Sequence, residues 1–129
     1  MAMKDLFNGI AARQCIAAQT LSATATGTAV DTATYESVTG IINVGAGLTT
    51  SNKLTVSLVE GDTAGTLTDV AAEDYLGSGS FDITAAGSYK IGYRGVKEYV
   101  AIKLTVTGTV STPVSASIIL SHPSVEPTV

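Results

Sequence analysis

Apolar and polar residues alternate along most of the chain, and a period of two predicts β-strands. The clearest example is the segment 100–107, where branched apolar side chains occupy every second position (Val100, Ile102, Leu104 and Val106). Because successive side chains of a strand point to opposite faces, these residues share one face. We expect that face to lie in the core.

A second alternating segment comes just before it and contains Tyr89, Ile91 and Tyr93. Between the two segments, Arg94-Gly95 offers a glycine, which tolerates a positive φ in a tight turn. We therefore predict that residues 89–108 form two strands joined by a short turn, and that they are the central strand pair of the fold.

Other apolar segments are bounded by clusters of Gly, Ser, Thr or Pro. The remaining predicted strands are residues 19–26, 38–44, 53–60, 66–70, 81–85 and 114–122, and one helical turn is expected at residues 71–76. Roughly eight short strands with almost no helix predict an all-β protein, either an antiparallel β-sandwich or a small barrel, with a jelly-roll-like arrangement of strands. The predicted sandwich domain covers residues 15–122. Residues 123–129 are expected to form an extended tail, because Pro123 and Pro127 have no N–H group to donate to a sheet.

Residues 1–14 differ from the rest and are predicted to be an N-terminal arm. Leu6, Phe7 and Ile10 would share one side of a short helical segment, which Gly9 weakens. An exposed Leu-Phe pair needs a partner, so the arm is predicted to dock on a neighbouring molecule. The candidate interface residues are Lys4, Leu6, Phe7 and Ile10. The alternative is a frayed terminus with one apolar anchor.

Composition narrows the classes of partner. The net charge is −4, and the seven Lys and Arg residues are scattered, so we expect no nucleic-acid partner. Only 14% of residues are charged, which suits a subunit packed into an assembly as well as a domain with a Thr-rich surface. No apolar run of about 18 residues occurs, so no membrane span is expected. The N-terminus lacks the pattern of a secretory signal, and we expect a protein made in a cytoplasm or built into a particle there.

The sequence contains few residues of the kinds that form a catalytic or metal site. The single histidine, His122, lies at the edge of a predicted strand, and the single cysteine, Cys15, excludes an internal disulfide and a cysteine-based zinc site. Glu73-Asp74 and Asp62 are better interpreted as solvated acidic residues than as a metal or acid–base pair. We therefore expect no enzyme, no cofactor and no metal.

Three tyrosines are close together in sequence, with basic residues between them (Tyr89, Tyr93, Tyr99, Arg94 and Lys97). Aromatic rings beside cations make a platform for a sugar or a base. They equally form the half-buried rim of a sheet with their hydroxyls toward water, and we favour this second interpretation.

Five segments carry a resemblance to a known group of proteins. They are MKDLFNGI (3–10), TATGTAVD (24–31), VEGDTAGTLTDVAAEDYLG (59–77), YKIGYRGVKEYVAIKLTVTGT (89–109) and ILSHP (119–123). This set is similar to small proteins encoded in the head-gene clusters of tailed bacteriophages and prophages. The chain departs from that pattern at Glu98, where relatives tend to carry a basic residue, and at Ala101, where they tend to carry Arg. Both departures weaken any charge-driven contact there.

The resemblance implies a non-enzymatic virion structural protein on the capsid surface, assembled in the host cytoplasm. The implied role is head decoration or capsid stabilisation, with the major capsid protein as partner, a homo-oligomer (a trimer is favoured), and the arm as anchor. One alternative is a head–tail joining or tail component. Another is a carbohydrate-binding module, with Tyr89 and Tyr93 beside Asp62 or Glu73 in a groove.

Overall fold

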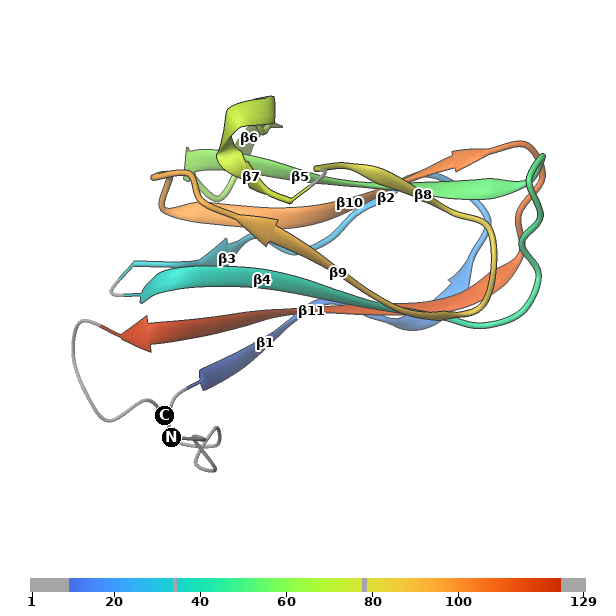
Figure 1. Cartoon of the computed structure of the whole chain (residues 1–129), viewed down its shortest axis with the longest axis horizontal. Coiled ribbons are helices and arrows are strands. Elements are labelled where there is room, and N and C mark those ends of the chain that lie inside the picture. The colour runs from blue at the N-terminus through green and yellow to red at the C-terminus, as the bar shows by residue number, and fades with distance from the viewer. Residues whose placement is uncertain (1–9, 34, 78, 124–129) are drawn as a thin grey trace.

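The computed structural model describes residues 10–33, 35–77 and 79–123, and these form two facing antiparallel β-sheets (Figure 1). The elements are β1 (Ile10–Leu21), β2 (Ala25–Thr26), β3 (Val30–Asp31), β4 (Tyr35–Val44), β5 (Lys53–Thr63), β6 (Thr66–Asp69), the short 3-10 helix η2 (Ala72–Asp74), β7 (Tyr75–Leu76), β8 (Phe81–Ile83), β9 (Gly87–Tyr93), β10 (Tyr99–Thr107) and β11 (Thr112–Pro123). The predicted all-β sandwich is confirmed, with more strands than expected because β2, β3 and β7 are two residues long. The 3-10 helix lies where a helical turn was predicted.

Sheet A has five strands in the order β1-β11-β4-β9-β7. Sheet B has six strands, with the order β2-β10-β5-β6, while β3 also pairs with β10 and β8 also pairs with β5. Every pairing is antiparallel. No helix among the described residues is long and apolar enough to cross a membrane.

The core lies between the two sheets and is built from the alternating positions that the sequence marks. Its largest fully buried side chains come from both sheets: Ile42, Ile118 and Leu120 from sheet A, and Leu54, Leu58, Ile83, Ile102 and Leu104 from sheet B. The sheets approach closely at Gly40, where an added Cβ would lie 2.9 Å from Ile102 Cδ1 and 3.0 Å from Ile91 Cγ2. Gly40 is therefore a packing position, and any side chain there would have to displace Ile102 of the facing sheet and Ile91 of the neighbouring strand.

The predicted central pair is not a pair. Strand β9 lies in sheet A beside β4 and β7, whereas β10 lies in sheet B beside β5, β2 and β3. The segment 94–98 crosses from one sheet to the other, and Gly95 does not adopt a positive φ there. An added Cβ at Gly95 would lie 2.6 Å from Tyr93 Cζ, so the glycine permits a close approach to the ring. Alternation predicts which side of a strand is buried, but both sheets of a sandwich bury one side, so it cannot identify the neighbour.

The ends of the domain also differ from the prediction. Strand β1 begins at Ile10, so residues 10–14, assigned to the arm, pair with β11 instead. Residues 1–9, which include Lys4, Leu6 and Phe7, and the tail residues 124–129 lie outside the described residues. Strand β11 extends to Pro123, which pairs with Tyr35. A proline is tolerated there because the last residue of a strand can lack a ladder hydrogen bond.

Cys15 joins the first strand to the opposite sheet. Its buried thiol accepts a hydrogen bond from the Ile102 N–H at 3.2 Å and donates one to the Thr28 carbonyl at 3.3 Å. Burial raises the pKa of this thiol, and the Ile102 N–H opposes that shift. Gly27 makes the contact possible, because an added Cβ would lie 2.7 Å from the Cys15 carbonyl oxygen. The cysteine therefore fastens β1 to β10 across the core.

Candidate interaction surface

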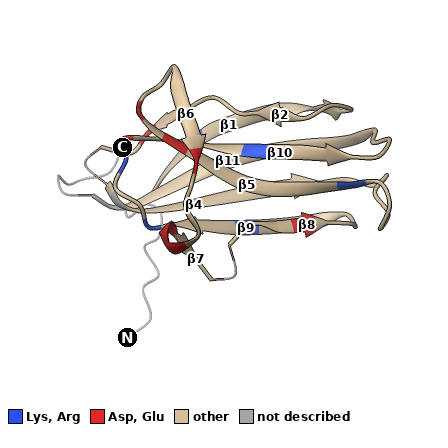
Figure 2. Cartoon of the chain, turned by 90° about the horizontal axis from the view of Figure 1, so that it is seen from above, with Lys and Arg blue, Asp and Glu red and all other residues tan. Residues whose placement is uncertain are grey.

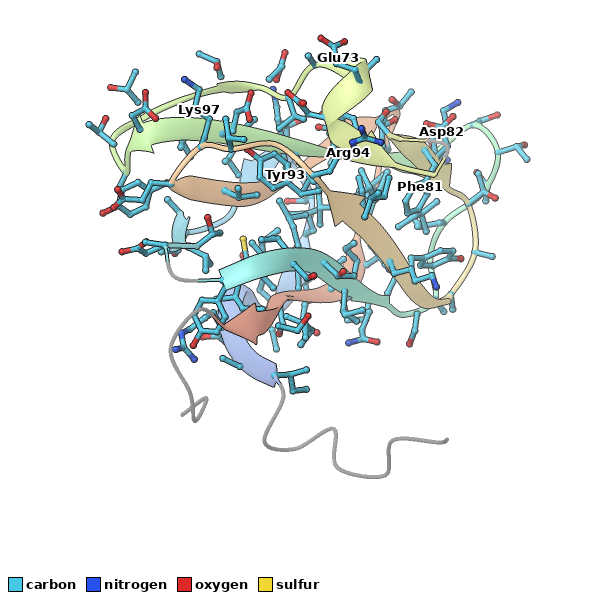
Figure 3. All side chains as sticks on the ribbon, turned by 60° about the vertical axis from the view of Figure 1, so that its left-hand side comes forward. Glu73, Phe81, Asp82, Tyr93, Arg94 and Lys97 are labelled. Carbon is cyan, nitrogen blue, oxygen red and sulfur yellow. The ribbon has the colours of Figure 1, made fainter. Side chains whose placement is uncertain are left out.

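Charged residues are unevenly distributed over the molecule. Asp and Glu residues gather mostly at the end of the sandwich that carries β6 and η2 (Figure 2). Glu73, Arg94 and Lys97 all belong to this end of the molecule (Figure 3). Lys97 Nζ forms an ion pair with Asp62 there at 3.2 Å. Such a surface is strongly hydrated, so burying it against a partner carries a high desolvation cost.

The outward-facing side of sheet A has the opposite character, and we call it the outer face of sheet A. The strand register places four rows of residues on it: Ile10, Ser121 and Ser37; Ala12, Ile119, Thr39, Gly92 and Leu76; Gln14, Ser117, Ile41 and Lys90; and Ser115, Asn43 and Ser88. Lys90 is the one charged residue in these rows. The buried residues of the same strands alternate with them and face the core.

This face can be desolvated at low cost. Most of its side chains are small and uncharged, and Ile41 and Ile119 occupy diagonal positions at its centre. On the same face, the Ser88 hydroxyl donates a hydrogen bond to Asn43 Oδ1 at 2.6 Å. Depletion of charge at the centre, with a polar margin, is the composition of the buried part of a protein–protein interface. The face is therefore suited to packing against another protein surface.

The outer face of sheet A is too small to form a stable protein–protein interface by itself. Four strands about 4.8 Å apart and about seven residues of ~3.4 Å each give a flat area of roughly 450 Å². A stable interface buries about 800 Å² on each partner. The face supplies about half of that area, so a stable contact needs a second element beside it. Ile10 is the first residue of β1 and lies at a corner of this face, so residues 1–9 connect to the chain there.

The structure does not bring the three candidate tyrosines together into a platform. Tyr93 is 4% exposed and lies between the sheets, where its hydroxyl donates to Glu60 Oε1 at 2.5 Å and accepts the Lys97 N–H at 3.1 Å. Burial, then the Glu60 hydrogen bond, raises the pKa of Tyr93 well above its ordinary value. Glu60 belongs to β5 and Tyr93 to β9, so this buried pair links the two sheets.

The other two tyrosines are also committed to local contacts. The Tyr89 ring packs against Phe81 with a centroid separation of 6.0 Å, and its hydroxyl donates to the Ala85 carbonyl at 2.7 Å. Tyr99 lies at the opposite end of the fold, where Glu98 and then Asp31 raise the pKa of its hydroxyl. With Tyr93 buried and Asp62 paired with Lys97, the groove proposed for a carbohydrate-binding module is not formed by these residues.

The other candidate chemical groups are also separate from one another. Glu73 and Asp74 belong to η2, and His122 lies near the end of β11. Within the ranges that the structure describes, no group of three or more His, Cys, Asp and Glu residues is placed to hold a metal ion. Of the four predicted interface residues, the described part of the chain contains Ile10 alone.

Sequence reasoning did not single out the outer face of sheet A. The signal was present in the uncharged Ser and Thr residues that alternate with core positions at 37–43 and 115–121. Alternating small polar residues look the same in any solvent-facing strand, however. Only the pairing of β4 and β11 with β1 and β9 shows that they combine into one continuous surface.

No protein-family model and no curated protein matches the chain. Solved structures do match its fold. The PBSX exported protein XepA has a TM-score of 0.61 and 14% identity over 92% of this chain, which spans 39% of the length of XepA. The SPBc2 prophage-derived protein YomS has a TM-score of 0.54 and 16% identity, with 88% of this chain and 95% of YomS covered. A protein of infectious bursal disease virus, Gx strain, has a TM-score of 0.50 and 14% identity, covering 92% of this chain and 34% of its own. At these identities the likeness establishes the fold, a β-sandwich that prophage-derived and viral proteins share.

Proposed function

We propose that the chain is a non-enzymatic structural protein of a virion, and that it decorates and stabilises the head by binding the major capsid protein. The observation that carries the proposal is that the outer face of sheet A is weakly charged, whereas acidic residues gather at one end of the sandwich. The sandwich shared with YomS and with a protein of infectious bursal disease virus supports a particle-associated role. The sequence resemblance to phage head-cluster proteins points in the same direction.

In this proposal the outer face of sheet A packs on the shell, and residues 1–9 extend the contact. The face alone covers about half of the ~800 Å² that each partner of a stable interface buries. Lys4, Leu6 and Phe7 precede Ile10 in the chain, and Ile10 lies at the corner of the face that β1 and β11 form. A trimer on the capsid surface would repeat this contact three times, and repeated weak contacts give strong attachment.

A charge placed on this face tests the proposal. Ser117 lies in the middle of the face, between Gln14 and Ile41. Ser117→Glu would bury an unpaired carboxylate in the contact, so we expect it to abolish co-sedimentation with shells of the major capsid protein encoded with this chain. Thr107→Glu adds the same charge to the exposed end of β10 in sheet B and serves as the matched control. Equal binding of both variants would exclude the outer face of sheet A as the contact.

Two further measurements address the arm and the type of assembly. Deletion of residues 1–9 is expected to abolish shell binding while circular dichroism and the melting temperature stay those of the β-sandwich. Normal binding by the deleted protein would rule out the anchor.

Quantitative mass spectrometry of purified particles gives the number of copies of this protein per particle. Copies in proportion to the major capsid protein are expected of decoration, whereas a single ring of subunits would identify a head–tail joining or tail component instead.

A further inference from the structure

A groove lies on the outward side of sheet B, on the other side of the sandwich from most of the outer face of sheet A. It has a volume of about 540 Å³ and lies between the outward face of sheet B and the segment that runs from β6 to β8. Ser57, Lys103 and Thr105 line it from the sheet, and Asp69, Tyr75 and Ser80 line it from the segment. Its volume falls within the range of roughly 300–1,000 Å³ that is typical of small-ligand sites.

Lys103 is the unusual residue of this groove. Lys53 and Lys97 are each half-buried and each is paired with an aspartate, at 3.0 Å and 3.2 Å. Lys103 is half-buried as well, but no ion pair or hydrogen bond is formed by its ammonium group within the described part of the chain. Its cross-strand partners, Ser57 on β5 and Thr26 on β2, are neutral. A partly buried cation that forms no ion pair within the described residues can accept an anionic group as its partner.

The groove also contains free hydroxyl groups, and its aromatic wall is the side chain of Tyr75. The hydroxyls of Ser57, Ser80 and Thr105 form no hydrogen bond within the described residues and are free to bind a ligand. The Tyr75 hydroxyl accepts the Leu58 N–H at 2.9 Å, at the point on β5 between its pairings with β6 and β8. The Val70 N–H donates to the Leu58 carbonyl at 3.1 Å, so two hydrogen bonds hold the segment to β5 at Leu58. The wall is thus held in position before any ligand arrives.

We propose that this groove binds an acidic sugar, with the carboxylate of a uronic acid on Lys103 and the sugar ring against Tyr75. The free Ser and Thr hydroxyls bind sugar hydroxyl groups, and the Asp69 carboxylate accepts a hydrogen bond from another. One cation beside one carboxylate matches a sugar unit that carries one carboxylate and several hydroxyls, such as each unit of a polyuronate, better than it matches inorganic phosphate. Because Ser57, Lys103 and Thr105 lie on the outward side of sheet B, they remain accessible while the outer face of sheet A is packed on a shell (Figure 1).

The test is an NMR titration of the full chain with trigalacturonic acid, with neutral maltotriose and inorganic phosphate as separate arms. Trigalacturonic acid is expected to shift the amide resonances of Ser57, Lys103 and Thr105. Lys103→Met should weaken its binding at least about tenfold, as for the loss of a charge-assisted hydrogen bond. Lys90→Met removes the same charge from an exposed, unpaired lysine on sheet A and should leave binding unchanged.

A third variant tests the role of Lys103 without removing it. Ser57→Asp places a carboxylate opposite Lys103 in the β5–β10 register, and it should abolish binding while raising the melting temperature slightly. The absence of shifts with trigalacturonic acid, or equal losses in Lys103→Met and Lys90→Met, would overturn the proposal. Binding of phosphate or maltotriose as tight as that of the uronate would refute an acidic-sugar site. Lys103→Met should bind shells normally, because the capsid contact does not use Lys103. Ser117→Glu tests the capsid proposal, so the two proposals can fail independently.

Discussion

The buried pair of Tyr93 and Glu60 gives the sharpest test of how the two sheets are held together. Tyr93→Phe keeps the ring in the core and removes only the hydroxyl, which donates to Glu60 Oε1 and accepts the Lys97 N–H. Glu60 is 9% exposed, so water cannot readily replace the lost donor. The variant therefore leaves a buried carboxylate without this donor and a partly buried N–H without its acceptor.

The expected cost follows from those two contacts. A hydrogen bond to a charged group contributes about 1.5–3 kcal/mol, and a neutral one about 0.5–1.5 kcal/mol. The Lys97 N–H is only partly buried and will recover some of its loss with water. We expect Tyr93→Phe to lower the free energy of unfolding by about 2–3 kcal/mol at neutral pH, a large part of the roughly 5–15 kcal/mol that stabilises a typical domain.

Urea unfolding followed by tyrosine fluorescence or circular dichroism measures this loss. Tyr89→Phe is the matched control, because its hydroxyl donates to the Ala85 carbonyl in an exposed position and should cost under about 1 kcal/mol. A double-mutant cycle with Glu60→Gln isolates the pair, and its coupling energy should be at least about 1 kcal/mol. Equal losses in the two Tyr→Phe variants, or zero coupling, would refute the argument that this pair holds the sheets together.

The pH dependence provides an independent check on the same residue. The pKa of Tyr93 is raised in the folded protein above the ordinary value of 10.0, because burial and the Glu60 hydrogen bond disfavour the phenolate. The folded state therefore holds this proton more tightly than the unfolded state does. The resulting stability is fully present below pH 10 and declines as the pH rises above it. Tyr93→Phe should flatten this alkaline decline, and an unchanged slope would contradict the assignment.

Three further predictions concern close contacts in the core. Gly40→Ala should cost about 1–3 kcal/mol by overpacking against Ile102, and Ile102→Val should recover part of the loss in thermal melts; additive losses would contradict the contact. Gly95→Ala should destabilise the protein by displacing the Tyr93 ring, and the loss should shrink in the Tyr93→Ala background. The buried thiol of Cys15, whose pKa is raised above 9.0, should react with a thiol reagent only at the rate of unfolding, and stability should begin to fall above pH 9; rapid labelling of the folded protein would contradict its burial.

The inward side of most strands could be predicted from the sequence, because burial imposes the alternation directly. Val100, Ile102 and Leu104 lie in the core as the pattern requires. The long first strand was missed for a physical reason. Register irregularities between Gln14 and Ile16, and again between Ile16 and Gln19, break the period of two, and its alanines give little contrast between faces.

The sequence could not predict which strands pair with one another, nor which surfaces the paired strands form. A five-residue link suits a hairpin within one sheet and a crossing between two, and residues 94–98 make the crossing. The buried Glu60 could not be recognised, because its hydrogen-bond donor comes from Tyr93 on the other sheet. The groove around Lys103 could not be predicted for the same reason, because distant segments form it. One wall comes from β5 and β10, and the other comes from the segment between β6 and β8.

The position of β11 in the middle of sheet A has a consequence for the timing of folding. Ile10 pairs with Ser121, so the first described strand finds its partner only after all the other described strands have been made. Until then β1 and β4 both lack the strand that lies between them. Pairings so distant in sequence make folding slow, and unpaired strands are prone to aggregate. We therefore expect sheet A to be completed only after β11 has been made, and chains that end before β11 to be insoluble.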